Sequence, residues 1–176
     1  PDMAPAIVPA SFVNDSLVLC VAPADIDAQQ ATVALTLNGQ QYTDPVRFPF
    51  FAVDSVSPNT GPSAGGTLVL INGTAFDAGG AYRCDFGDGG VSTATRRNDY
   101  TLACVSPSAS SSGVRPLEVS LNARDFTASN ISFSYFPHPT MASVLPTCGP
   151  VDGETVVAVR SSALGGLGGG SHYLCA

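Results

Sequence analysis

The chain has 176 residues, a length that allows one large domain or two small ones. Seven basic residues stand against fourteen acidic ones, which gives a net charge of -7, so the sequence lacks the positive surface that binds nucleic acid. Charged residues make up only 12%, while 18 glycines and 14 prolines indicate frequent chain reversals, and this composition favours an all-β fold.

Cysteines and glycosylation sequons indicate an oxidising environment. The five cysteines form no Cys-x-x-Cys pair, which argues against a zinc knuckle, and their wide spacing suits disulfides. Sequons for N-glycosylation begin at Asn14, Asn72 and Asn130. No apolar run reaches the roughly 18 residues that span a bilayer, and the first residues lack the pattern of a signal peptide. We expect an extracellular protein, secreted or at the cell surface, whose signal and any membrane anchor lie outside this sequence.

Segments of the sequence recur at two fixed offsets. ND followed by CVAP at 14–23 recurs 84 residues later as ND followed by CVSP at 98–107. SVSP at 55–58 recurs 88 residues later as SVLP at 143–146. Such spacing is the signature of repeated domains. The predicted organisation is the back half of one copy over 1–52, a complete copy over 53–136, a short linker at 137–139, and the front half of a further copy over 140–176.

Within the complete copy, short runs rich in β-branched and aromatic residues alternate with turn formers, a pattern typical of a β-sandwich. Strands are expected at 53–57, 67–72, 82–86, 91–94, 100–105, 116–121 and 132–136. Residues 58–62 are expected to bend the chain, and Gly87-Asp88-Gly89-Gly90 to form a hairpin turn. Asp85 and Asp88 raise the alternative of a calcium loop, but the ordered ligand spacing of an EF-hand is absent, which favours the plain turn.

Two cysteines of the complete copy are predicted to bond each other. Residues two apart in a strand share a face, so Cys84 points the same way as Phe86, and Cys104 the same way as Leu102. If both faces point into the sandwich, the two sulfurs can meet. A Cys84 to Cys104 disulfide would close a loop of about 20 residues and contribute about 3 kcal/mol.

No catalytic, metal or cofactor site can be assembled from the sequence. His138 lies between two prolines in the expected linker, and His172 has no spaced ligand nearby. A third histidine, a G-x-S-x-G motif and suggestively paired carboxylates are all lacking. The glycine-rich segment 165–170 has no following Lys-Ser/Thr, which a phosphate loop requires. We predict that the protein is not an enzyme and needs no metal or cofactor.

The complete copy carries motifs that resemble a known family. These motifs are SVSPNTGPSAGGTLVLINGTAF at 55–76, CDFG at 84–87, LACVSP at 102–107, VSLN at 119–122 and FSYF at 133–136. They resemble the IPT/TIG signature. The cysteine arrangement is similar to that of fibrocystin-like ectodomains, and GPSAGGT is similar to the turn of plexin repeats. The resemblance implies immunoglobulin-like β-sandwiches, here in a tandem, extended array.

The remaining cysteines are interpreted through the repeat. Cys20 occupies the position of Cys104 in its copy and Cys175 that of Cys84, so each is expected to bond a cysteine outside this sequence. A Cys20 to Cys175 bond would join the half copies into one permuted sandwich. Domains like those of the family have termini about 25 Å apart, whereas a disulfide needs Cα atoms within about 7 Å. We therefore expect no bond between Cys20 and Cys175. Cys148 has no counterpart and is left unassigned.

The resemblance implies a non-catalytic role in structure or adhesion. Stacked domains would form a rod or filament and contact neighbouring domains of the same chain, other copies, or another surface protein. One alternative is an ancillary module of a secreted carbohydrate-active enzyme. Another is a Rel-type transcription factor that dimerises and binds DNA, which the acidic balance and the cysteine pattern oppose.

Overall fold

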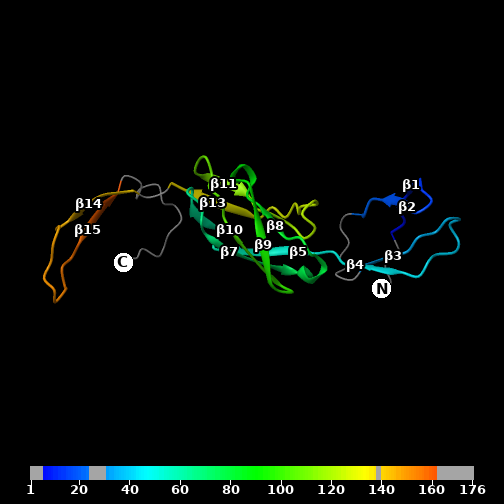
Figure 1. The fold of residues 1–176 in the computed structure, drawn as a ribbon, viewed down its shortest axis with the longest axis horizontal. Helices are drawn as coiled ribbons and strands as arrows, with labels where there is room; N and C mark the ends of the chain where they lie inside the picture. The colour runs from blue at the N-terminus through cyan, green and yellow to red at the C-terminus, as the bar shows by residue number, and fades with distance from the viewer. Residues whose placement is uncertain (1–5, 24–30, 138–139, 162–176) are drawn as a thin grey trace. The chain divides into compact units, whose positions relative to one another are not determined.

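The computed structural model describes residues 6–23, 31–137 and 140–161, and the chain divides into two compact units, Pro1–Phe50 and Phe51–Ala176 (Figure 1). The regular elements of the described residues are 15 β-strands and two short 3-10 turns. The prediction of an all-β fold is therefore confirmed. In the same ranges no helix is long and apolar enough to cross a membrane.

Residues 52–136 fold into two sheets. The first has six strands in the spatial order β12 (Glu118–Ser120), β8 (Arg83–Asp85), β9 (Val91–Asn98), β10 (Thr101–Val105), β7 (Leu68–Thr74) and β5 (Ala52–Ser57). The second has three strands in the order β11 (Gly113–Pro116), β13 (Ser132–Phe136) and β6 (Thr60–Pro62). The 3-10 turns η1 (Phe76–Ala78) and η2 (Gly87–Gly89) lie on either side of β8 in the sequence.

Strand β9 turns the six-stranded sheet into two layers. Its residues 91–93 pair with β8, whereas its residues 94–98 pair with β10. In a flat sheet β8 and β10 would lie about 9.6 Å apart, because neighbouring strands are separated by about 4.8 Å. The Cα atoms of Cys84 in β8 and Cys104 in β10 are only 6.6 Å apart. The sheet therefore folds over along β9, and β8 faces β10 across the interior.

Alternate residues of the strands fill this interior. In β7, Val69 and Ile71 are fully buried while Leu68 and Leu70 point outward, because successive side chains of a strand point to opposite faces. The buried hydrophobic core consists of Val69, Ile71, Phe76, Cys84, Phe86, Ala94, Leu102, Cys104, Leu117, Val119, Leu121, Phe133 and Tyr135. Burial of each large side chain contributes about 1.5 to 3 kcal/mol.

The segment after β5 departs from the prediction. The sequence predicts a bend at 58–62, but Thr60–Pro62 form β6, which pairs in parallel with β13. Gly61 is small enough for this close approach: a Cβ atom there would lie 2.7 Å from Cζ of Phe133 and closer still to Thr67. The chain bends at Pro58 as predicted, but Gly61 serves packing between strands rather than a turn, so the prediction is wrong for residues 60–62.

Two further strands differ in extent. The sequence predicts one strand over 116–121, but the chain forms β11 and β12 around Leu117, and these pair with β13 and β8 respectively. The sequence predicts a strand over 91–94, whereas β9 continues to Asn98 through the polar residues TRRN. The other predicted strands agree with the structure to within two residues at each end.

The unit Pro1–Phe50 contains two hairpins, β1 (Ala10–Asn14) with β2 (Leu17–Cys20), and β3 (Ala31–Val33) with β4 (Val46–Phe48). The first hairpin has the register of β9 with β10, moved back by 84 residues. Ala10 pairs with Cys20 as Ala94 pairs with Cys104, and both hairpins have a bulge at the equivalent place. The sequence repeat is thus also a repeat of strand pairing.

The same offset relates two surface loops. Oδ1 of Asn38 accepts hydrogen bonds from the backbone N–H groups two and three residues ahead, and Oδ1 of Asn122 does the same. Oγ1 of Thr43 and Oγ1 of Thr127 each accept a 3.0 Å bond from the backbone N–H eight residues before. The repeated residues therefore repeat their hydrogen bonds.

A last hairpin pairs β14 (Met141–Leu145) with β15 (Ala158–Ser161). Its register is that of β5 with β7, moved forward by 88 residues. Val144 pairs with Val159 as Val56 pairs with Ile71, and the bulge lies at the equivalent place in both. The second offset found in the sequence therefore also repeats a strand pairing.

Candidate interaction surface

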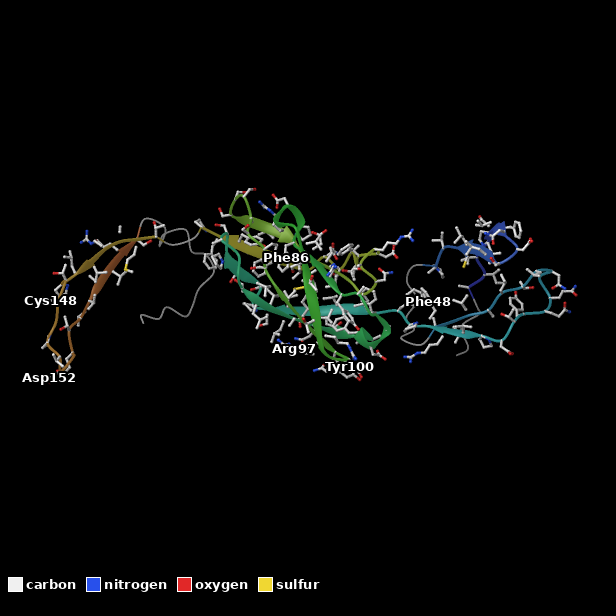
Figure 2. The ribbon with its side chains drawn as sticks, viewed as in Figure 1. Phe48, Phe86, Arg97, Tyr100, Cys148 and Asp152 are labelled. Atoms are coloured by element: carbon white, nitrogen blue, oxygen red, sulfur yellow. A yellow bond between two sulfur atoms is a disulfide. The ribbon has the colours of Figure 1, made fainter. Side chains whose placement is uncertain are left out.

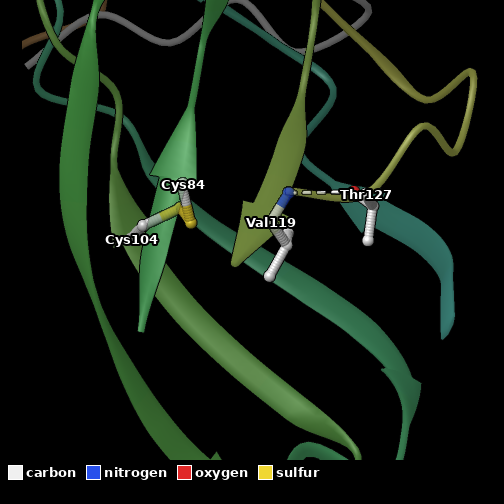
Figure 3. Close-up of a disulfide and its surroundings, with 4 residues drawn as sticks. All are labelled: Cys84, Cys104, Val119 and Thr127. Carbon is white, nitrogen blue, oxygen red and sulfur yellow. Dashed lines mark hydrogen bonds between the residues drawn. A yellow bond between two sulfur atoms is a disulfide. The ribbon is translucent and has the colours of Figure 1, made fainter. Parts of the chain in front are cut away.

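A disulfide between Cys84 and Cys104 joins the two layers (Figure 3). Both cysteines are buried. Val119 of β12 pairs with Cys84, and its N–H donates a 3.0 Å hydrogen bond to Oγ1 of Thr127. The disulfide spans the fold made by β9, so the two layers are held together covalently as well as by packing.

Two cysteines carry free thiols in the part of the chain that the structure describes. Cys20 in β2 and Cys148 after β14 are both exposed, and Figure 2 labels Cys148. Cys175 lies outside the described residues. Bonds from Cys20 and Cys175 to cysteines outside this sequence stay a prediction, and Cys148 stays unassigned.

The two aspartates of the β8–β9 turn each have a partner: one accepts a hydrogen bond from the backbone, and the other forms an ion pair. Oδ1 of Asp85 accepts a 2.9 Å hydrogen bond from the N–H of Gly87. Asp88 forms an ion pair with Arg115. Both carboxylates are thus engaged in the hairpin turn that the sequence favours over a calcium loop.

The residues weighed for catalysis or metal binding lie largely beyond the described ranges. His138, His172 and the segment 165–170 fall outside them. Among residues 6–23, 31–137 and 140–161, no three His, Cys, Asp or Glu side chains gather in a group that could hold a metal ion. The absence of catalysis and of a cofactor stays a prediction.

All three sequon asparagines are exposed. Asn14 lies at the end of β1, and its Oδ1 accepts hydrogen bonds from the N–H and Oγ of Ser16. Asn130 precedes β13 with a left-handed backbone, φ 57°. The sequence predicts that a strand ends at Asn72, but β7 continues past it to Thr74. Attachment of sugar to these asparagines stays a prediction.

The outward side of β5, β7, β10 and β9 is uncharged around Leu68 and Leu70, and its charged residues, Asp54 and Arg97, lie at the bulges of β5 and β9. We call this surface the outer face; its other side chains are Ser55, Ser57, Leu68, Leu70, Asn72, Thr95, Thr101, Ala103 and Val105. Leu68 lies directly opposite Val105, and Leu70 directly opposite Ala103. Leu68 is 52% and Val105 49% exposed. The sequence shows only that LVLI at 68–71 is apolar throughout, which does not reveal which residues stay outside.

The end of the β9–β10 hairpin combines aromatic and cationic side chains. Tyr100 is 65% exposed, and Arg97, three residues before it in the sequence, is also exposed (Figure 2). Arg96 and Asp99 form an ion pair with an N–O distance of 2.6 Å. Tyrosine and arginine are enriched among the residues that dominate protein contacts. The sequence alone does not single out this group, because its residues stand out only through their exposure.

Tyr135 is a buried donor on the inner side of the second sheet. Its hydroxyl donates a 3.0 Å hydrogen bond to the carbonyl of Pro107. Burial raises the pKa of Tyr135 above its ordinary value, and the negative charge of Asp88 adds to this while the positive charge of Arg115 opposes it. The neutral phenol therefore ties β13 to the loop after β10.

The sequence of residues 52–135 matches the model of the IPT/TIG domain. Plexin-A3 of Rattus norvegicus is 29% identical over 113 residues, or 64% of this chain, and Plexin-A2 of Homo sapiens is 32% identical over 133 residues, or 71% of this chain. In both cases the chain spans only 6% of the length of the relative.

A solved structure shares the fold. The full extracellular region of plexin A4, domains 1 to 10, matches 88% of this chain and 14% of its own length, with a TM-score of 0.55 and 23% sequence identity.

Proposed function

Because residues 52–135 are an IPT/TIG domain, we propose that the chain is a non-catalytic part of an extracellular protein, in which such domains follow one another as a semi-rigid rod and contact other proteins. The match over residues 52–135 carries this proposal. The contacts are with neighbouring domains of the same chain and with other copies or another surface protein.

Two observations support an extracellular location. The buried Cys84–Cys104 disulfide is the kind of bond that persists in oxidising compartments, and the three sequon asparagines are all exposed. The two relatives compared above are plexins, and the solved structure compared above is the extracellular region of a plexin.

Repeated strand pairing supports a tandem array. We assign residues 1–52 to the back half of one domain, 53–136 to a complete domain, 137–139 to a linker and 140–176 to the front half of a further domain. The β1–β2 and β14–β15 hairpins have the registers of β9–β10 and β5–β7. Val159 is 39% exposed where its equivalent Ile71 is fully buried, as expected of a hairpin taken from a larger sandwich.

Contact with other proteins is tested at the β9–β10 hairpin end. We expect the full-length protein to be displayed on or secreted from eukaryotic cells. We also expect Tyr100→Ala to lower its binding to neighbouring cells several-fold, because an exposed ring supplies contact area at low entropic cost. Flow cytometry measures the binding. Phe126→Ala is the matched control, since Phe126 is a loop ring that is 37% exposed. Equal binding by the two variants would contradict this contact site, and retention in the cytosol would contradict the location.

The array is tested by the bonds of Cys20. Non-reducing peptide mapping of the secreted protein should show Cys20 bonded to a cysteine that is not among the five of this sequence, because its equivalent Cys104 bonds a partner from the front half of its own domain. A bond between Cys20 and Cys175 within one chain would contradict the tandem array and favour a single permuted sandwich.

A further inference from the structure

The apolar part of the outer face has a defined shape. Leu68 and Leu70 follow each other on β7, and Val105 and Ala103 lie directly opposite them on β10. The four side chains form a short apolar row in which Leu68, Leu70 and Val105 are exposed and Ala103 is buried between them, and the hydroxyl groups of Ser57 and Thr95 flank it on the adjoining strands. Exposed apolar rows on a sheet promote association unless something covers them.

A sequon lies in line with this row. Asn72 is the next outward residue of β7 after Leu70, so it is about 7 Å further along the strand. Its side chain is exposed and lies between two hydroxyl residues: Nδ2 donates to Oγ of Ser55 at 3.5 Å, and Oδ1 accepts from Oγ1 of Thr101 at 3.3 Å. The amide nitrogen that receives sugar is therefore on the outer face itself.

We propose that an N-linked glycan on Asn72 lies along the outer face and covers Leu70, Leu68 and Val105. Sugar rings present C–H groups on their faces and hydroxyls at their rims, which match an apolar row flanked by serine and threonine. Around the apolar row the paired residues of the adjoining strands, Ser57 and Thr95, are uncharged, so a protein partner finds no ion pair there; the charged Asp54 and Arg97 lie at the bulges of β5 and β9. A protein docking on this face would have to displace the glycan, so the glycan directs contacts to other parts of the domain.

This inference rests on the proposed extracellular location, because the sugar is added only during export. Its consequence is that the glycan keeps the domain from associating through the outer face. Without the glycan, the exposed leucines and Val105 would be available to hydrophobic dyes and to other copies of the chain.

The test uses a matched pair of substitutions in the full chain secreted from eukaryotic cells. Thr74→Ala destroys the sequon and keeps Asn72, whereas Thr74→Ser keeps the hydroxyl and the sequon. We expect Thr74→Ala to bind severalfold more anilinonaphthalene sulfonate and to self-associate at lower concentration in sedimentation, and Thr74→Ser to behave like the parent. Adding Leu68→Ser and Leu70→Ser to Thr74→Ala should abolish both increases, which would assign them to the outer face.

Equal dye binding and sedimentation of the Thr74 pair would overturn the inference. So would mass spectrometry that finds Asn130 glycosylated and Asn72 bare, a result that leaves the extracellular location intact. If instead Asn14, Asn72 and Asn130 were all bare in secreted native material, both the inference and the sequon support for export would fail.

Discussion

Replacing Cys84 and Cys104 together by alanine lowers the free energy of unfolding of the complete domain by about 3 kcal/mol, because the bond closes a loop across 20 residues and thereby limits the unfolded chain. Both sulfurs are buried, so the loss of packing adds to the entropic effect. A domain of this size has a total stability of only about 5 to 15 kcal/mol. The disulfide thus supplies a large share of it.

Hydrogen exchange of the β7 and β10 amides measures this change within the full chain, since these strands are paired on both sides. Reduction of the parent chain should accelerate exchange by a similar factor, and the double variant should not respond to the reductant. Cys148→Ala is the control because Cys148 is exposed and unbonded. Unchanged protection in the double variant would show that packing alone holds the two layers.

Phe133→Ala lowers the free energy of unfolding of the complete domain by about 3 to 5 kcal/mol, because it leaves a cavity at the centre of the core. The ring of Phe133 is fully buried, and its centroid lies 5.3 Å from that of Phe86 and 5.0 Å from that of Tyr135. Its edge also closes against Gly61 of β6. One substitution therefore removes contacts with three neighbours.

Phe126→Ala makes the same chemical change on a partly exposed ring and should cost far less. Thermal unfolding followed by circular dichroism compares the two variants, and Phe133→Leu should recover most of the loss by refilling the volume. If Phe133→Ala melted no lower than Phe126→Ala, the assignment of Phe133 to the centre of the core would be wrong.

Local patterns account for what the sequence predicted well. In β7 and β10 the runs LVLI and LACV are apolar throughout, which indicates strands but not which side of each strand faces inward. Residues two apart share a face of a strand, which groups Cys84 with Phe86 and Cys104 with Leu102, and the structure buries all four and joins the two sulfurs. The three sequon asparagines are exposed, as glycosylation at them requires.

The remaining features depend on contacts distant in sequence. Gly61 reads as a turn residue locally, yet its role is set by Phe133, which lies 72 residues later and leaves no room for a side chain. The polar end of β9 forms a strand because β10 pairs with it, and propensity gives no hint of this. Leu68, Leu70 and Tyr100 are exposed because no other described segment packs over them, and the residues around them in the sequence do not show this.

The parallel pairing of β6 with β13 has a mechanical consequence. In the proposed array of domains, tension would enter this domain before β5 and leave after β13. Once β5 had given way, the pull would drive β6 and β13 lengthwise past each other. Their backbone contacts, from Ser134 N–H to the carbonyl of Asn59 and from Ser63 N–H to that of Phe136, both 2.8 Å, would then be loaded side by side and would have to break together. Bonds loaded in parallel share the force, so in the proposed array this short pairing would resist unfolding of the domain when its ends are stretched.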